Sequence, residues 1–402
     1  MAPDIAAARA AAIAIAVSQS ESLDLLDAAG RVLGADLFAR HDVPPFDNSA
    51  MDGYAVRCTD LGGHGPWRLP VGGRSAAGDL AGANDLQPGT AMRIFTGAPV
   101  PAGFDAVIMQ EDCERQGDTV AIAARPSPGH NIRRAGEDVA AGTRLLSRGD
   151  LLTPQRLALL AESGHAQADV FRKVRIGLIS TGSELREPGE PLAPGQIHNS
   201  NRVFLRAMLG ALAWAEVHDF GIIPDDRKRI EQALHEASRT CDAIVTTGGV
   251  SVGDEDHIAA IMREGGGRLD VVKVAMRPGK PVKIGLIGHT FLAGLPGNPN
   301  SALVTFRRIA LPALRAMAGL SVIEPAWQPA IAGFSHAKKP DRTEFVPVRR
   351  SGQTDAGMPI LELLARGSSA SLSAMAAADG IALLPPEDTA IEPGMLLRFE
   401  PF

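Results

Sequence analysis

The sequence predicts a multidomain protein that joins an α/β domain to smaller β-rich domains. Its 402 residues are too many for a single hydrophobic core. Between residues 174 and 322, apolar strands alternate with helical patterns, which is typical of a three-layer α/β domain with a parallel sheet. In residues 43–138 and 323–402, short apolar runs alternate with turns rich in glycine and proline, as in small β-domains.

The first 42 residues carry two helical patterns. The apolar run Ile5–Val17 contains Arg9 and follows Asp4, so it suits neither a membrane span nor a signal peptide. We expect it to form an alanine-rich helix that packs on a neighbouring element. A second helical pattern covers Leu23–Leu33 and is broken near Gly30.

The β-domain is expected to contain strands at Ala91–Phe95, Ala106–Gln110 and Thr119–Ala123. A helix should follow it, with Thr153 as the N-cap, and should end at Gly164, where glycine can adopt the left-handed conformation.

The alternation of strands and helices begins at Val174, and the C-terminal β-domain begins after Glu324. Expected strands are Val174–Ser180, Ala215–Phe220, Ala243–Thr247, Val271–Ala275 and a hairpin over Val282–Leu292; expected helices are Ser200–Leu212, Asp226–Ser238, Asp254–Glu264 and Ser301–Ala318. The C-terminal domain should contain strands Thr343–Val348, Ile360–Leu364, Ile381–Leu384 and Leu396–Phe399.

Composition limits the possible functions. Forty basic and 46 acidic residues give a net charge of −6, which argues against a general nucleic-acid binder. The three cysteines are far apart and form no CxxC pair, so a zinc ribbon is excluded and a reducing compartment is expected. No histidine cluster with zinc-ligand spacing is present, so His198 and His257 are read as ordinary polar residues.

Three loops at the ends of predicted strands favour an anion site. Thr246–Asp256 carries a Gly248-Gly249 pair where a strand ends and a helix begins, so backbone N–H groups can turn toward a phosphate. Gly294–Ser301 has the same position before the next helix, and Met276–Pro281 adds two cations, Arg277 and Lys280. One such turn is commonly only structural, but three at one sheet edge predict a shared pocket.

Acidic residues follow the same strands. Glu184, Asp225 and Asp256 each lie just after a strand or at the start of a helix. Asp226 is better explained as a helix cap. Carboxylates beside an anion site need a cation between them, and Mg²⁺ bound by Asp225 and Asp256 is the natural candidate.

Polar turns in the β-domain are less informative. Asp52 follows a run of small polar residues that reads as a turn, and by chemistry alone it need not be catalytic. Arg133 and Arg134 could contact a phosphate or only improve solubility.

Seven runs nevertheless resemble the signature segments of the MoeA and gephyrin E-domain family, in the family's order and across nearly the whole chain. They are Phe46–Val56 (FDNSAMDGYAV), Thr96–Pro101 (TGAPVP), Gly136–Asp138 (GED), Ser180–Leu185 (STGSEL), Gly248–Gly253 (GGVSVG), Pro278–Pro281 (PGKP) and Gly294–Ser301 (GLPGNPNS).

The resemblance implies four subdomains. These are an elongated helical or dimerisation domain (1–42 and 139–173), a β-domain (43–138), an α/β molybdopterin-binding domain (174–322) and a C-terminal β-barrel-like domain (323–402). It also implies a cytoplasmic homodimer, with the active-site cleft between the α/β domain of one subunit and the β-domain of the other.

The implied reaction is the transfer of molybdate to adenylylated molybdopterin, with release of AMP and with help from a divalent cation, Mg²⁺. A transient contact with a molybdopterin adenylyltransferase would deliver the substrate, and neither nucleic acid nor membrane is expected as a partner. By motif, the implied catalytic residues are Asp52, Glu184, Asp225, Asp256, Lys273 and Lys280, with Asp225 and Asp256 on the metal. The implied substrate-binding residues are Thr96, Asp138, Asn201, Gly248, Gly249, Ser251, Gly253, Arg277, Pro296, Asn298, Pro299, Ser301, Arg342 and Ser369.

The chain departs from the family pattern at two places. His198-Asn199 stands where the family usually has an aromatic residue or arginine followed by aspartate, and Arg277 stands where some members have lysine. An enzyme that catalyses this molybdate transfer is called a molybdenum insertase, and two alternatives to it remain. One is an enzyme like the molybdopterin adenylyltransferase, which would not need the two β-domains, and the other is a non-catalytic scaffold like gephyrin.

Overall fold

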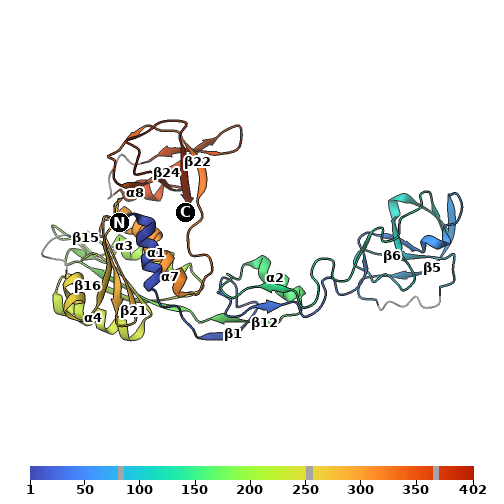
Figure 1. Ribbon diagram of the computed structural model, residues 1–402, viewed down its shortest axis with the longest axis horizontal. Helices are drawn as coiled ribbons and strands as arrows, with labels where there is room; N and C mark the ends of the chain where they lie inside the picture. The colour runs from blue at the N-terminus through green and yellow to red at the C-terminus, as the bar shows by residue number, and fades with distance from the viewer. Residues whose placement is uncertain (80–85, 250–256, 365–370) are drawn as a thin grey trace. The chain divides into compact units, whose positions relative to one another are not determined.

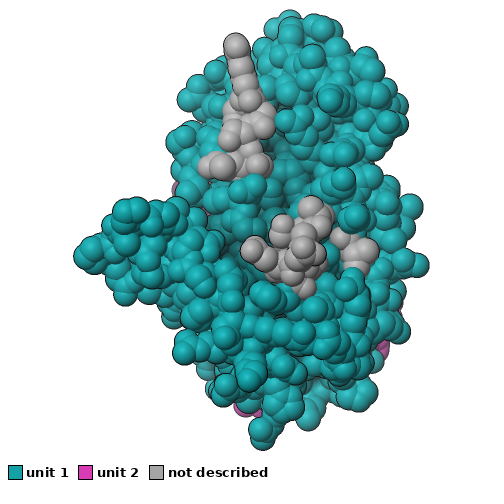
Figure 2. Space-filling model, turned by 90° about the vertical axis from the view of Figure 1, so that its left-hand side faces the viewer, with its two compact units in different colours: residues 1–35, 148–153, 169–402 teal, residues 36–147, 154–168 magenta. Residues whose placement is uncertain are grey.

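The computed structural model describes residues 1–79, 86–249, 257–364 and 371–402. The chain forms two compact units, shown in Figures 1 and 2. Unit 1 comprises residues 1–35, 148–153 and 169–402, and unit 2 comprises residues 36–147 and 154–168.

The core of unit 1 is a six-stranded sheet of order β16-β13-β17-β21-β20-β18. Its strands are β13 (Val174–Thr181), β16 (Ala215–Ile223), β17 (Ala243–Thr247), β18 (Arg268–Lys273), β20 (Pro281–Ile287) and β21 (Thr290–Leu295). The first four strands in the sheet order are parallel, while β20 runs antiparallel to both of its neighbours. The predicted parallel sheet is therefore mixed at one edge, because the predicted hairpin reverses the chain.

Helices cover both faces of this sheet. The helices are α3 (Ser200–Gly210), α4 (Arg227–Thr240), α5 (His257–Glu264), α6 (Pro299–Thr305) and α7 (Leu311–Met317), with the π-helical segment η3 (Phe306–Ala310) between the last two. Ile230 of α4 and Ile258 of α5 share one apolar cluster with the sheet, whereas Leu205 of α3 and Leu314 of α7 belong to another. These two clusters make the three-layer α/β arrangement that the sequence predicts.

The N-terminal segment agrees with one helical prediction and contradicts the other. Helix α1 (Pro3–Ile13) packs against α7 and η3, as expected for an alanine-rich helix (Figure 1). The helix expected over Leu23–Leu33 is wrong. Strand β1 (Ser20–Asp24) instead pairs with β12 (Gln167–Phe171), and Leu26, the central apolar residue of the pattern, is 95% exposed. Pairing with a strand far along the chain has overridden local helical spacing.

Strand and helix limits shift slightly elsewhere. The strand expected over Val271–Ala275 begins at Arg268, and the single helix expected over Ser301–Ala318 is interrupted by the π-helical turn. Short pairs complete the unit: β14 (Leu185–Arg186) with β15 (Ile197–His198), and β23 (His336–Ala337) with β27 (Ala390–Ile391).

The C-terminal part of unit 1 is a closed β-barrel. Its five strands are β22 (Gln328–Ala332), β24 (Thr343–Gln353), β25 (Pro359–Leu363), β26 (Gly380–Leu384) and β28 (Leu396–Pro401), with a short helix α8 (Leu372–Ala376). The order β24-β25-β22-β28-β26 is closed by pairing of β26 with β24. Strand β19 (Met276–Arg277) adds to β24, so the cationic turn of the α/β domain is joined to the barrel.

Unit 2 is built on a six-stranded sheet of order β7-β4-β6-β5-β9-β8. The strands are β4 (Gly53–Val56), β5 (Trp67–Ser75), β6 (Ala91–Ile94), β7 (Ala106–Met109), β8 (Cys113–Gln116) and β9 (Thr119–Ile122). Short strands β2 (Leu37–Phe38), β3 (Asn48–Ser49), β10 (Ile132–Arg133) and β11 (Arg144–Leu146) pair as β2-β11 and β3-β10; the 3-10 turns are η1 (Cys58–Asp60) and η2 (Gln110–Asp112). Helix α2 (Pro154–Glu162) ends before Gly164, whose φ of +86° is the predicted left-handed cap.

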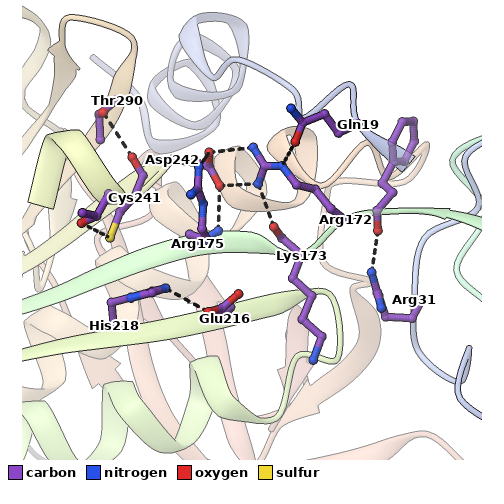
Figure 3. A network of polar contacts seen from close by, with 12 residues as sticks. Gln19, Arg31, Arg172, Lys173, Arg175, Glu216, His218, Cys241, Asp242 and Thr290 are labelled. Carbon is purple, nitrogen blue, oxygen red and sulfur yellow. Dashed lines mark hydrogen bonds and ion pairs between the residues drawn. The ribbon is translucent and has the colours of Figure 1, made fainter. Parts of the chain in front are cut away.

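A polar network lies at the amino ends of the central strands (Figure 3). Asp242, just before β17, accepts hydrogen bonds from Arg172 Nη1 at 2.7 Å and from Arg172 Nη2 at 2.9 Å. It also accepts the backbone N–H of Arg175 at 2.8 Å. The carboxylate therefore joins two neighbouring strands and the segment that leads into them.

No helix within the described residues combines the length and apolarity needed to cross a bilayer. The three cysteines, Cys58, Cys113 and Cys241, are free.

Candidate functional site

Three loops meet at the carboxyl edge of the central sheet. Strands β13, β17 and β21 are parallel, and their registers place Ser180 opposite Thr247 and Thr247 opposite Leu295. The loops that follow these strands therefore leave the sheet side by side, where ligands of open α/β sheets bind.

The Gly248-Gly249 pair allows two of these loops to pack closely. Both residues have positive φ, +88° and +64°, and a Cβ on Gly248 would lie 2.2 Å from the carbonyl oxygen of Thr181. Gly248 N also donates to Leu295 O at 3.2 Å. The glycines are required by this close approach as well as by their backbone conformation. Ser251, Gly253 and Asp256 of the same predicted loop lie outside the described residues.

Asn201 of α3 connects the end of β17 to the loop before α6. It is buried in the first turn of α3, and its Nδ2 donates to Thr247 Oγ1 at 2.8 Å and to Gly297 O at 2.6 Å. Its Oδ1 and the Oγ1 of Thr181 are buried and have no hydrogen bond to any described residue. Two buried polar groups at this edge thus lack the hydrogen-bond partner that such groups usually have.

The acidic residues Glu184 and Asp225 belong to the same edge. Asp225 Oδ2 accepts the backbone N–H of Ser183 at 3.0 Å, and Ser183 Oγ accepts the N–H of Asp225 at 3.0 Å. Glu184 is exposed and folds back toward Gly182. Asp226, in contrast, accepts the N–H of Arg229 at 2.9 Å, which confirms its prediction as the helix cap of α4.

A cavity of about 320 Å³ lies between the cationic turn, α6 and the barrel. Four predicted substrate-binding or catalytic residues line it: Arg277, Lys280, Ser301 and Arg342. Ser369, expected beside them, lies outside the described residues, and Lys273 is exposed at the end of β18 without lining the cavity. The cavity thus presents three cationic side chains and a hydroxyl to an anion.

Two further side chains of this cavity were not predicted from the sequence. Glu344 is 4% exposed; its carboxylate accepts from Arg277 Nη1 at 3.3 Å and lies 3.1 Å from His336 Nε2. Glu344 therefore holds Arg277 beside the cavity. Glu344 lies two residues after Arg342, which was predicted, so its neighbourhood was a usable signal, whereas nothing in the sequence marked His336.

Comparison with known proteins agrees with this architecture. Three family models match in succession: "MoeA N-terminal region (domain I and II)" over residues 3–164, "Probable molybdopterin binding domain" over residues 177–316, and "MoeA C-terminal region (domain IV)" over residues 329–402. The molybdopterin molybdenumtransferase of Haemophilus influenzae is 41% identical over 330 residues, which cover 82% of this chain and 80% of the relative.

The chain belongs to the MoeA family of molybdopterin molybdenumtransferases.

Other MoeA relatives extend this result. Molybdopterin molybdenumtransferase 2 of Mycobacterium tuberculosis is 44% identical over 307 residues, 74% of this chain and 75% of the relative. A crystal structure of the molybdopterin biosynthesis MoeA protein from Pyrococcus horikoshii OT3 superposes with a TM-score of 0.84 at 27% identity and covers both chains completely. The predicted multidomain α/β and β architecture is confirmed.

At His198-Asn199 the chain departs from the MoeA family pattern, and the structure shows what Asn199 does there. Asn199 is buried and caps α3 by accepting the N–H of Arg202 at 3.1 Å. His198 is exposed, with Nε2 3.0 Å from Glu190 O. Asn199 therefore keeps the helix-capping function that aspartate would also perform.

The loop residues Pro296, Asn298 and Pro299 lead into α6. Pro296 is buried and its carbonyl accepts from Thr247 Oγ1 at 3.3 Å, whereas Asn298 is exposed. The hydrogen bond to Pro296 holds the loop against β17 just before the helix begins.

In unit 2 the structure brings Asp52 and Thr96 together. Asp52 Oδ1 accepts the backbone N–H of Thr96 at 2.8 Å and its hydroxyl at 2.7 Å. These two hydrogen bonds, the backbone one above all, lower the pKa of Asp52, and the charge of Arg93 adds to the effect. Asp138 is exposed in the same unit, and its backbone N–H donates to Val43 O at 3.0 Å.

Arg134 of unit 2, a possible phosphate contact by sequence, is paired with a carboxylate in the structure. Its Nη1 lies 2.5 Å from Asp47 Oδ2, and the backbone N–H of Ala135 donates to the same carboxylate at 2.9 Å. The pKa of Asp47 is lowered by the hydrogen bond from Ala135 and by Arg134. We therefore regard Arg134 as part of a local turn.

Proposed function

We propose that this protein inserts molybdate into adenylylated molybdopterin, releasing AMP and molybdenum cofactor. The observation that carries the proposal is the cavity lined by Arg277, Lys280, Ser301 and Arg342, beside α6. The loop before α6 also accepts hydrogen bonds from Asn201 of α3 and from Thr247 at the end of β17. The anion cavity and the carboxyl edge of the sheet therefore adjoin the same segment.

The cavity suits molybdate, a tetrahedral dianion. Guanidinium groups donate in a fixed fork, and charge-assisted hydrogen bonds are about twice as strong as neutral ones. The buried carboxylate of Glu344 would repel a dianion if it were unpaired, but Arg277 and His336 contact it. Arg342 and Lys280 also line the cavity.

The carboxyl edge of the sheet suits the adenylyl phosphate. Gly248 and Gly249 keep the backbone open at the end of β17, and backbone N–H groups in such turns bind phosphate oxygens. The unpaired Oγ1 of Thr181 and Oδ1 of Asn201 support a polar ligand here, because buried polar groups seldom stay without a partner.

We include Mg²⁺ on Asp225 and Asp256 in the proposal. Asp225 fits this role: one carboxylate oxygen accepts from Ser183, and the other has no hydrogen bond to a described residue. In proteins Mg²⁺ is usually held by one or two carboxylates together with substrate phosphate oxygens. When bound, Mg²⁺ would neutralise charge on the leaving AMP. Asp225 would hold the ion, and Glu184 and Lys273 are included in the proposal as catalytic residues.

The remaining parts of the proposal concern assembly. The enzyme is a cytoplasmic homodimer in which Asp52, Thr96 and Asp138 complete the active site of the other subunit, and a molybdopterin adenylyltransferase delivers the substrate. The division into domains at residues 1–42 with 139–173, 43–138, 174–322 and 323–402 belongs to the same proposal. The matches to the MoeA N-terminal and C-terminal models support the insertase over an adenylyltransferase, which would need neither region.

The proposal is tested with purified protein, adenylylated molybdopterin, molybdate and Mg²⁺. We expect stoichiometric AMP release and recovery of activity in a molybdenum-dependent apo-enzyme. Consumption of ATP with molybdopterin would instead indicate an adenylyltransferase, and neither activity would indicate a scaffold. Asp256→Asn should block AMP release while substrate still binds; normal turnover in that variant would refute the metal assignment.

A further inference from the structure

A second cavity, of about 420 Å³, shares no lining residue with the cavity of the proposed active site. Its apolar wall includes Met208 and Leu212 from the region of α3 and Leu311 of α7. Its polar wall includes Arg307, Arg315 and Glu400. The volume is within the range of small-molecule pockets, which are mostly apolar with a few convergent polar groups.

One carboxylate in this wall is already fully engaged. Glu400 is 2% exposed; Arg307 Nε donates to its Oε1 at 2.8 Å, and Arg308 Nη1 donates to its Oε2 at 2.9 Å. Burial lowers the pKa of Arg308, although Glu400 opposes this. Two guanidinium groups on one carboxylate leave this wall with an excess of positive charge.

The third guanidinium, Arg315, adds to that excess. Its Nη1 donates to the backbone carbonyl of Ile323 at 3.3 Å, and no carboxylate among the described residues lies within ion-pair distance. A guanidinium has five N–H donors, so most of those on Arg315 are available. Burial lowers the pKa of Arg315; the charge of Glu400 opposes this shift, and the charges of Arg307 and Arg308 add to it. A further anion in the cavity would stabilise the charged guanidinium.

The backbone beside these arginines has an unusual geometry. Arg307 and Arg308 lie in the π-helical segment η3, and both reach Glu400 although they are consecutive. In a regular α-helix consecutive side chains point about 100° apart. Single π-helical turns inside α-helices occur frequently at functional sites.

We propose that this cavity binds a small carboxylate that carries an apolar body. The carboxylate pairs with the fork of Arg315, a geometry that guanidinium groups favour, and the apolar body packs on Met208, Leu212 and Leu311. The site is separate from the molybdate cavity, and its existence does not depend on the proposed insertase activity.

The test uses isothermal titration calorimetry of the full chain with three probes. Benzoate has both the charge and the apolar ring, benzamide has the ring without the charge, and sulfate has charge without the ring. We expect saturable binding of benzoate, at least about tenfold tighter than that of benzamide or sulfate. Equal affinity for benzoate and benzamide, or no benzoate binding, would overturn the proposal.

Two variants locate the binding. Arg315→Gln removes the charge and should weaken benzoate binding about tenfold or more. Ala211→Phe, at the exposed end of α3 where the backbone is helical, fills the cavity without changing a charge and should abolish binding even if the arginine variant is unstable.

Two matched controls exclude other sites. Arg239→Gln removes an exposed arginine at the end of α4, and Lys280→Gln removes a cation of the molybdate cavity. Both should bind benzoate like the parent protein. Benzoate binding that is lost in Lys280→Gln and kept in Ala211→Phe would assign the anion to the molybdate cavity and refute the second site.

Discussion

Asp52 Oδ1 and Thr96 form a two-point contact in unit 2, through the backbone N–H at 2.8 Å and the hydroxyl at 2.7 Å. Both hydrogen bonds favour the ionised carboxylate, so the pKa of Asp52 is lower than its usual value of 3.8. Thr96 thereby keeps Asp52 anionic and oriented, even though the carboxylate is open to solvent.

The first prediction is that Thr96→Val raises the pKa of Asp52 while Thr96→Ser leaves it nearly unchanged. Valine has a similar shape and keeps the backbone hydrogen bond, but it cannot donate a hydroxyl. Ionised Asp52 stabilises the folded protein above the unfolded pKa, and this stabilisation is lost as the pH falls through the lower folded pKa. The folded pKa of the valine variant is higher, so the variant should lose the stabilisation at a higher pH. Carbon-13 NMR titration of the carboxyl group gives the pKa; identical curves for valine and wild type would contradict the assigned cause.

The second prediction concerns the anion cavity. Lys280→Gln and Arg342→Gln should each raise the KM for molybdate about tenfold to a hundredfold, since a hydrogen bond to a charged group contributes about 1.5–3 kcal/mol. Lys339→Gln is the control, because it removes a nearby lysine that does not line the cavity. Initial rates against molybdate concentration provide the measurement. Unchanged KM in both cavity variants would remove the molybdate assignment.

The third prediction concerns the cation. Chelation of Mg²⁺ should stop AMP release, and Asp225→Asn should increase the Mg²⁺ concentration needed for half-maximal activity by about tenfold or more, because an amide lacks the charge that Mg²⁺ prefers. Asp226→Asn is the matched control: asparagine caps helices as well as aspartate does, and Asp226 Oδ1 already accepts the backbone N–H of Arg229 in α4. If the two variants respond equally to Mg²⁺, Asp225 is not a metal ligand.

Local chemistry explains what the sequence could predict. Asp226 as a cap, Gly164 as a helix end and the strands from Val174 onward depend on neighbouring residues or on simple periodicity. The meeting of the loops after β13, β17 and β21 was also predictable, because parallel strands bring their carboxyl ends to one edge.

Long-range pairing explains what the sequence could not predict. Residues Ser20–Asp24 form a strand because Gln167–Phe171 pairs with them, and no local pattern carries that information. The contact of Glu344 with Arg277 and His336 similarly requires the barrel to pack on the cationic turn. The π-helical turn is a further non-local feature, since the sequence around Phe306 reads as ordinary helix.

The fourth prediction tests the glycine requirement at the sheet edge. Gly248→Ala should lower both stability and activity, because its φ is +88° and the new Cβ would lie 2.2 Å from Thr181 O. Left-handed backbone alone costs alanine about 1 kcal/mol, and the clash adds to it. Gly297→Ala has open space around the Cβ and no positive φ, so its free energy of unfolding should match wild type. Urea unfolding compares them; equal stability of the two variants would show that the Thr181 loop can move away.

The fifth prediction concerns Asp242, which joins β17 to Arg172 and Arg175 (Figure 3). Burial opposes ionisation of this carboxylate, but the hydrogen bonds from Arg172 and Arg175 outweigh it and lower the pKa. Asp242→Asn should reduce the free energy of unfolding by about 2–3 kcal/mol at neutral pH, because two guanidinium groups lose a partly buried anionic partner. Glu264→Gln, which breaks an exposed ion pair with Arg227, should change it by less than about 0.5 kcal/mol.

The pH dependence makes this prediction specific. Because the folded pKa of Asp242 is lowered, its contribution is fully present above the ordinary carboxyl pKa of 3.8 and disappears only as the pH falls through the lower folded value. The difference in unfolding free energy between wild type and Asp242→Asn should therefore stay constant from pH 7 to about pH 5 in urea titrations. A difference that also stays constant as the pH falls from about 4 to about 2 would mean that Asp242 has the same pKa in the folded and unfolded states, and the arginine contacts would then not stabilise its charge.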